Sequence, residues 1–228
     1  MTSDSPPARP PTEAYGVGRV EAFSDGVIAV AITLLVLDLR VPEPVGESLA
    51  PRLAALWPNY LAYVISFLAI GIMWINHHAT LRRLVAVDHS VLVLNLLLLM
   101  CIVVLPFTTS LFATYLDAGA GAHLAAVVYA GAFLVTSLVF FALQCLLLLR
   151  RPQLLREPLA PRQRRSILLR GSVAAPVYLL AALLGLLTPY LTLAVCIALG
   201  LFYLLPVRSS SRPRSAGIPP EAEHTAGR

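Results

Sequence analysis

Six long apolar segments constrain this chain more than any other feature of its sequence. They lie at about 19–39, 57–76, 91–116, 123–149, 167–187 and 190–207, and most have about the 20 residues that a helix needs to cross about 30 Å of hydrocarbon. Hydrophobic residues make up 58% of the chain and charged residues only 13%, against roughly 25% charged in a soluble domain. We therefore predict a protein that crosses a membrane several times.

The apolar segments predict helices and argue against strands. A membrane-spanning strand alternates polar and apolar positions over about 10 residues, whereas the segment at 91–107 is apolar on every side. A helix also satisfies its own backbone hydrogen bonds within lipid. The predicted fold class is an all-α, polytopic membrane protein with six transmembrane helices.

The two ends of the chain differ in composition from the apolar part. Residues 1–14 and 208–228 are rich in proline, serine and charged residues, which predicts two disordered tails. Residues 15–207 then form one six-helix transmembrane domain. Its first segment is not predicted to be a cleavable signal, because Arg19, Glu21 and Asp25 interrupt it.

Arginine placement predicts the orientation in the membrane. With six spans, one side receives both tails, Arg82 and Arg83, and the arginine-rich segment 150–170, while the other side receives only Arg40 and Arg52. Short cytoplasmic loops collect positive charge, so both termini are predicted to be cytoplasmic in a multi-pass plasma-membrane protein. The net charge of +5 fits a basic surface against anionic membrane lipid, and no nucleic-acid partner is predicted.

The first segment is unusually polar for a membrane span, and its polar residues separate by helix face. At 100° per residue, Asp25 points nearly opposite to one face formed by Arg19, Phe23, Gly26, Val27, Val30, Thr33, Leu34 and Leu37. Polar groups within a span must pair inside the bundle or line a water path. We expect Arg19, Ser24, Asp25 and His77 to form a cluster that ties the first segment to the second.

Two later polar residues are candidates for hydrogen bonds between helices. Asn95 and Gln144 each lie inside an otherwise apolar segment. No cofactor, metal site or catalytic group is predicted, so the chain is not expected to be an enzyme.

The first segment also resembles that of a known family. The pattern Arg-x-x-x-Phe-Ser-Asp, the run at 33–37 and the stretch Trp-Ile-Asn-His-His at 74–78 are similar to the transmembrane-protein-175 potassium channels. The pattern is formed by Arg19, Phe23, Ser24 and Asp25. The resemblance implies a bacterial K⁺ channel built as a homotetramer, in which the first helix of each copy lines the central pore.

The resemblance also implies roles for individual residues. Val30 takes the position of a hydrophobic constriction, Leu34 and Leu37 those of further apolar layers, and Thr33 that of a pore-facing threonine. Arg19, Phe23, Ser24, Asp25 and His77 take those of a structural motif and gating network. Isoleucine or leucine is more usual at the constriction, so Val30 implies a wider ring and a modest preference for K⁺ over Na⁺. Periodicity alone would favour a plain packing stripe.

Two other functions remain open from the sequence. A secondary transporter for protons or other cations could use Asp25 and the nearby histidines, although no paired broken helices or inverted repeat support it. A purely structural membrane scaffold would show no ion flux at all.

Overall fold

The protein is described here from a computed structural model, which places residues 16–39, 41–42 and 48–204. The predicted tails at 1–14 and 208–228 lie outside these described residues. The described chain contains these helices in order: α1 (Val17–Leu34), α2 (Leu49–Ala55), α3 (Trp57–Leu81), α4 (His89–Tyr115), α5 (Ala122–Cys145), α6 (Pro161–Gly185) and α7 (Pro189–Leu204). A 3₁₀ turn, Leu35–Asp38, prolongs α1, and a π turn, Leu146–Arg150, prolongs α5.

The all-helical prediction is confirmed for the described part of the chain, which contains only an isolated β-bridge besides helices and turns. Five helical segments there are long and apolar enough to cross a membrane, and they begin at Val17, Trp57, His89, Ala122 and Pro161. Helix α7 is apolar but has only 16 residues, a length of about 24 Å. The sixth span therefore stays a prediction.

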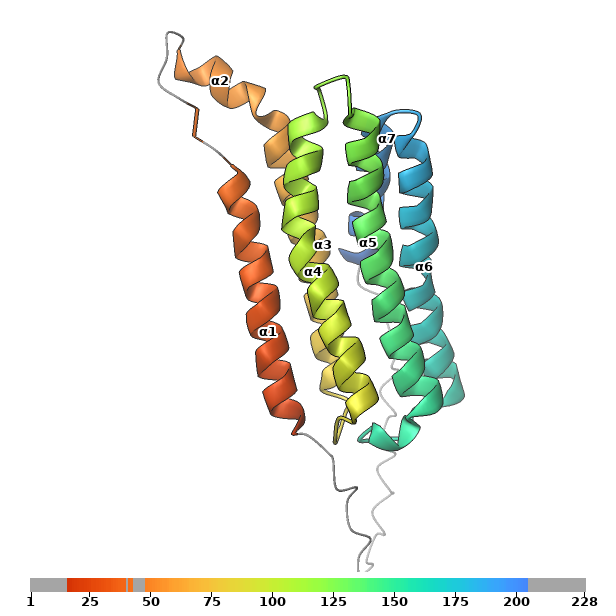
Figure 1. Ribbon diagram of the computed structural model, residues 1–228. Helices are drawn as coiled ribbons and strands as arrows, with labels where there is room; N and C mark the ends of the chain where they lie inside the picture. Colours follow the sequence, from red (N-terminus) through yellow and green to blue (C-terminus); the bar gives the residue numbers. More distant parts are fainter. Residues whose placement is uncertain (1–15, 40, 43–47, 205–228) are drawn as a thin grey trace, which may run out of the picture.

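Helix α2 was not predicted. Its seven residues are too few to show a helical hydrophobic period, and Leu49 and Leu53 are both exposed. Figure 1 shows α2 lying across one end of the bundle, just before α3 begins. The first two spans are thus joined by a partly helical connection.

Helix α1 lies at the edge of the bundle (Figure 1). It packs against α3 and α4, while α5 packs against α4 and α6, and α7 against α3, α5 and α6. The side chains of α1 that are buried recur every three or four residues: Val17, Val20, Ser24, Ile28, Ala31 and Leu35. One stripe of α1 therefore holds the helix against its neighbours, and the opposite side is left open.

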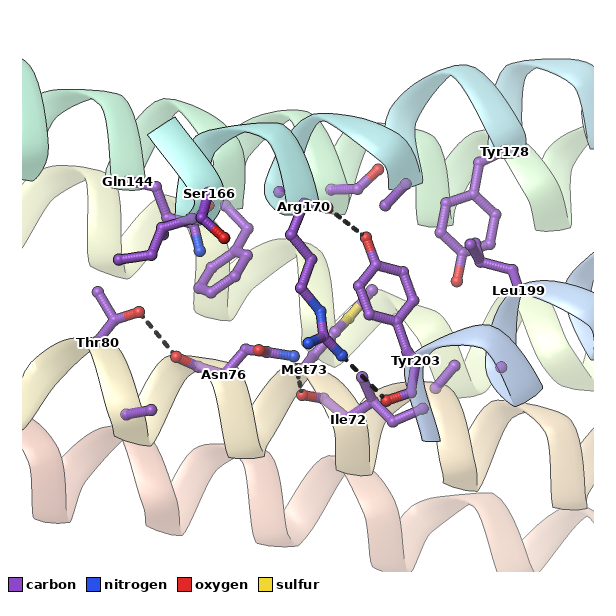
Figure 2. A pocket seen from close by; sticks show the side chains of 18 of the residues that line it. Ile72, Met73, Asn76, Thr80, Gln144, Ser166, Arg170, Tyr178, Leu199 and Tyr203 are labelled. Atoms are coloured by element: carbon purple, nitrogen blue, oxygen red, sulfur yellow. Dashed lines mark hydrogen bonds between the residues drawn. The ribbon is translucent and has the colours of Figure 1, made fainter. Parts of the chain in front are cut away.

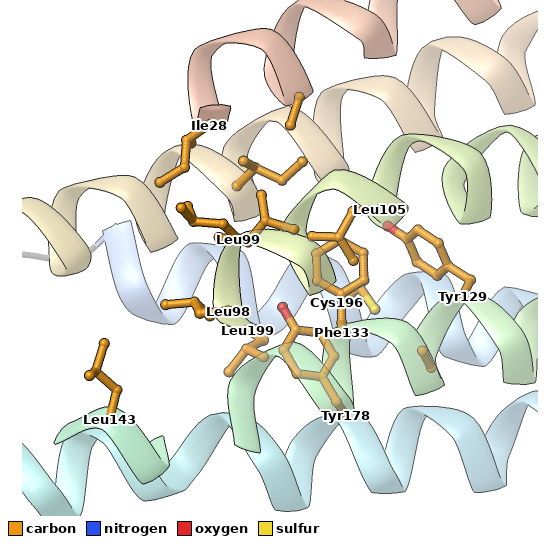
Figure 3. Packing of buried hydrophobic residues seen from close by; sticks show 14 of the residues in the cluster. Ile28, Leu98, Leu99, Leu105, Tyr129, Phe133, Leu143, Tyr178, Cys196 and Leu199 are labelled. Atoms are coloured by element: carbon orange, nitrogen blue, oxygen red, sulfur yellow. The ribbon is translucent and has the colours of Figure 1, made fainter. Parts of the chain in front are cut away.

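The core of the bundle contains a column of aromatic rings (Figure 3). Tyr129 stacks on Phe112 with ring centroids 4.7 Å apart, and Phe133 stacks on Tyr178 at 5.2 Å. The Tyr129 hydroxyl also forms a 3.0 Å hydrogen bond with the Ser66 hydroxyl. These contacts join α3, α4, α5 and α6 through rings that fill the space between them.

The arginine-rich loops meet at one end of the bundle, as their predicted placement on one side requires. The loop after α3 pairs with the loop before α6: the backbone N–H of Val85 donates to the Leu154 oxygen at 2.9 Å, and that of Arg156 donates to the Arg83 oxygen at 2.8 Å. Arg151 also pairs with Asp88 at 3.0 Å. Helix α1 begins at this same end, which we call the basic end (Figure 1).

A pair of leucines on α5 tests this packing. Leu143 is fully buried and Leu138 is 49% exposed. We expect Leu143→Ala to lower the free energy of unfolding by roughly 1–3 kcal/mol, because it leaves a cavity that lipid cannot fill. Leu138→Ala, the matched control, should change it by less than about 0.5 kcal/mol. Thermal unfolding in detergent measures both, and equal losses would contradict the described packing of α5.

Candidate functional site on the first helix

The predicted pore residues lie on the open side of α1. Val30 is 57% exposed and Leu37 70%, and Thr33 and Leu34 are also exposed. The Thr33 hydroxyl donates a 2.9 Å hydrogen bond to the Val30 backbone oxygen, so it bonds to its own helix. The described chain therefore presents a face, formed by these four residues, that is apolar apart from one hydroxyl and is covered by no other described helix.

Ser24 lies on the packed side of α1 and joins three helices. Its hydroxyl donates to the Val20 oxygen at 2.8 Å and accepts a hydrogen bond from the Asn95 amide at 3.0 Å. The Asn95 oxygen in turn accepts from Nε2 of His77 at 2.7 Å. All three side chains are at least 99% buried, so this network connects α1, α4 and α3 inside the bundle. The predicted interhelical role of Asn95 is confirmed.

Asp25 is held by α3 and not by α4. The indole N–H of Trp74 donates to one Asp25 oxygen at 2.8 Å, and Nδ1 of His78 lies 3.9 Å from the other. His78 lies closer to Glu21, at 3.0 Å, and its ring stacks on Trp74. A charge-assisted bond of this kind holds one end of α1 against α3.

The same three titratable side chains could hold a metal ion. Nδ1 of His78 and one carboxylate oxygen each from Glu21 and Asp25 all lie within 4.8 Å of one another. Imidazole nitrogen and carboxylate oxygen are both ligands that zinc accepts. Trp74, which binds the second oxygen of Asp25, would orient that ligand. The sequence predicted no metal site, because it did not indicate that Glu21 and His78 meet.

The expected cluster of Arg19, Ser24, Asp25 and His77 therefore divides into two. Ser24 and His77 meet only through Asn95, while Asp25 turns to Trp74 and His78. Arg19 and Phe23 are both exposed, and the Arg19 guanidinium makes no hydrogen bond or ion pair within the described residues. The inclusion of Arg19 was wrong for a single protomer, because its position places it on the open side of α1.

Asn95→Ala tests the buried network. It leaves Ser24 and His77 without their shared partner in a site that water does not reach. We expect a loss of roughly 1–3 kcal/mol in the free energy of unfolding. Asn76→Ala is the matched control, because the Asn76 amide bonds only to the Ile72 oxygen of its own helix. Unfolding by heat or denaturant measures both variants. Equal losses of unfolding free energy in Asn95→Ala and Asn76→Ala would contradict an interhelical role for Asn95.

The family described as "Endosomal/lysosomal potassium channel TMEM175" matches residues 19–106, which include most of α1, all of α2 and α3, and the first part of α4. A potassium channel of Streptomyces collinus is 40% identical over 202 residues, covering 86% of this chain and 98% of that relative. The chicken endosomal/lysosomal proton channel TMEM175 is 40% identical over 115 residues but is covered over only 23% of its length.

A solved structure shares the fold as well as the sequence. The crystal structure of a lysosomal potassium-selective channel TMEM175 homolog from Chamaesiphon minutus superposes with a TM-score of 0.73 at 38% identity. The match covers 82% of this chain and 95% of that one. This chain thus aligns with nearly the whole length of both bacterial relatives, 98% of one and 95% of the other. The chain belongs to the TMEM175 family of membrane channels.

Proposed function

We propose that this protein is a potassium channel whose pore is lined by α1. The observation that carries the proposal is the open face of α1, where Val30, Thr33, Leu34 and Leu37 are exposed in the protomer. A channel needs such a face, because the side chains that line the pore cannot be covered by their own subunit. The bacterial relatives named potassium channels support the choice of ion.

Four copies of α1 around one axis would close the pore. One protomer offers a single helix face, which cannot enclose a water path by itself. A closed ring of identical subunits places the same face of every copy toward the axis. The surfaces that face lipid would then be formed by α5, α6 and α7. The basic end of the bundle and both termini would lie on the cytoplasmic side of a bacterial plasma membrane.

The pore chemistry follows from the residues on this face. A ring of Val30 side chains excludes water when the ring is narrow, so small movements of α1 would switch ion flow by wetting and dewetting. One turn away, the Thr33 hydroxyl can supply an oxygen to an ion or to its remaining water shell. None of the four lining residues is acidic, so we expect selection by size and hydration and a modest preference for K⁺ over Na⁺.

The two polar groups behind this face would fix its position. The Ser24–Asn95–His77 network and the Asp25–Trp74 bond attach α1 to α3 and α4 on the side away from the pore. Any movement of α1 would have to stretch or break these hydrogen bonds. We therefore assign Ser24, Asp25 and His77 to gating and not to ion coordination.

Val30→Ala tests the constriction. Removing two methyl groups widens the ring and lowers the cost of wetting it by about 1 kcal/mol, so K⁺ flux should rise about fivefold. The measurement is K⁺ flux from liposomes that contain the purified protein. Val135→Ala on α5, where the valine is 51% exposed, is the control and should leave flux unchanged. Unaltered flux in Val30→Ala would place the constriction elsewhere.

Thr33→Ala tests selectivity. The substitution removes the hydroxyl nearest the proposed constriction, and we expect the K⁺ to Na⁺ permeability ratio to fall by about threefold. Reversal potentials under a K⁺ and Na⁺ gradient measure the ratio. Thr80→Ala is the control and should keep this ratio, because the Thr80 hydroxyl donates to the backbone oxygen of Asn76 on its own helix. If both variants keep the wild-type ratio, Thr33 does not contribute to selection.

A proton-conducting function is the second candidate, since the vertebrate relatives are named proton channels. The described pore face carries no titratable side chain between Val30 and Leu37, which favours K⁺ over a proton relay. Currents measured with equal K⁺ on both sides and a pH gradient distinguish K⁺ conduction from proton conduction. A reversal potential that follows the pH gradient would overturn the K⁺ assignment.

The proposed assembly makes its own prediction. In mild detergent the particle should have about four times the chain mass of 24.6 kDa after correction for bound detergent. Light scattering coupled to size exclusion measures this mass. A monomer or dimer that still conducts K⁺ would contradict the pore described here.

A further inference from the structure

A cavity lies between α3, α5, α6 and α7, on the side of the bundle away from α1 (Figure 2). Its volume is about 290 Å³. It follows α6 from Ser166 near the basic end to Tyr178, a distance of about 18 Å along the helix. Helix α7 packs against both α3 and α6 and is shorter than either. The cavity lies between α3 and α6, near Leu204 at the end of α7.

One part of the cavity is cationic. Arg83 and Arg170 line it, and the described lining residues include no aspartate or glutamate. Figure 2 shows the Arg170 guanidinium extending from α6 across the cavity toward α3. One of its outer nitrogens donates to the backbone oxygen of Tyr203 at 3.4 Å, and its central carbon lies 5.6 Å from the centre of the Tyr203 ring. These contacts orient the guanidinium without neutralising it.

Two polar groups in this cavity are shielded from water and unpaired within the described chain: Nε of Arg170 and Oε1 of Gln144. Gln144 is only 7% exposed. Its amide occupies space that the absence of a side chain at Gly171 provides, because a Cβ there would lie 2.2 Å from Oε1. Gln144 was predicted to bond between helices, and its oxygen does not do so here. The Gln144 amide therefore lies at the wall of the cavity, against α6.

The other part of the cavity is apolar. Ala174 and Tyr178 of α6 and Leu199 of α7 line it, together with Ala69 and Met73 of α3. A ligand that fills both parts must have an anionic head and a hydrocarbon portion. The volume is near the lower end of roughly 300–1,000 Å³ for small-molecule sites, so it admits a head group and the beginning of an acyl chain but not a whole lipid.

We propose that this cavity binds the phosphate head group of an anionic membrane lipid. Arg170 and Arg83 supply charge to the phosphate, and a guanidinium is well suited to pair with phosphate oxygens. Phosphatidylglycerol is an anionic lipid of this kind. The acyl chain begins against Ala174 and Leu199. This proposal does not depend on ion conduction and concerns a different face of the protomer from α1.

The test is lipid binding by the full-length protein, measured by native mass spectrometry with phosphatidylglycerol and with zwitterionic phosphatidylcholine. We expect phosphatidylglycerol to bind at least about tenfold more tightly, and Arg170→Gln to remove most of that difference. Arg162→Gln is the matched control, because it removes one exposed charge from the same helix outside the cavity. If Arg170→Gln and Arg162→Gln lose the same share of the preference for phosphatidylglycerol, the lipid is attracted only by surface charge and the proposed site is wrong.

A second variant and a competitor separate the remaining outcomes. Ala174→Phe fills the apolar part and should weaken phosphatidylglycerol binding about tenfold while leaving Arg170 in place. Excess inorganic phosphate should not displace the lipid. If phosphate competes and Ala174→Phe has no effect, the ligand is a soluble phosphate and the lipid assignment is wrong. Protein yield and a thermal melt of each variant verify that it folds.

Discussion

The structure depends on a hydrogen bond that crosses from α4 to α1. The Asn95 amide donates to the Ser24 hydroxyl, and the same asparagine accepts from His77 of α3. Helix α1 sits at the edge of the bundle (Figure 1), and its other described polar contacts are those of Glu21 and Asp25 with α3. In lipid, apolar side chains do not drive helices together, so packing and interhelical hydrogen bonds must do so. This network therefore sets where α1 lies and how it is rotated.

The rotation of α1 is what gives the channel its surface. Because Ser24, Ile28 and Ala31 face the bundle, Val30 and Thr33 must face away from it. Asp25 lies between the two sides and is held by Trp74, which keeps its charge off the open face. A helix that carries a carboxylate in a membrane span can thus still present an apolar surface on its open side.

The sequence predicted the helices well because membrane spans carry strong, local signals of length and hydropathy. Helical periodicity also grouped Val30, Thr33 and Leu37 on one face of α1, although periodicity alone favoured a packing stripe and did not indicate that this face is open. The pore-lining role of that face was predicted from the family resemblance. The solved bacterial relative confirms the family and the fold, while the pore roles of individual residues stay predictions.

The pairing of polar side chains between helices could not be predicted from the sequence. Which of His77 and His78 meets Asp25 depends on the rotation of α3 by one residue, about 100°. Asn95 was a candidate for a hydrogen bond, but its partner on α1 lies 71 positions away in the sequence. Arg19 was included in the predicted cluster, although its helix face separates it from Asp25. The cavity beside α7 depends on helix lengths and contacts that no local pattern encodes.

Cysteine accessibility along α1 tests the central claim most directly. In a chain whose three native cysteines are replaced by alanine, single cysteines are introduced on the open face, at Val30, Thr33, Leu34 and Leu37, and on the packed face, at Ile28, Ala31 and Leu35. K⁺ flux is measured before and after a charged, water-soluble thiol reagent. If α1 lines the ion path, the reagent blocks flux only for cysteines on the open face. Block from the packed face, or from neither face, would show that α1 does not line the ion path.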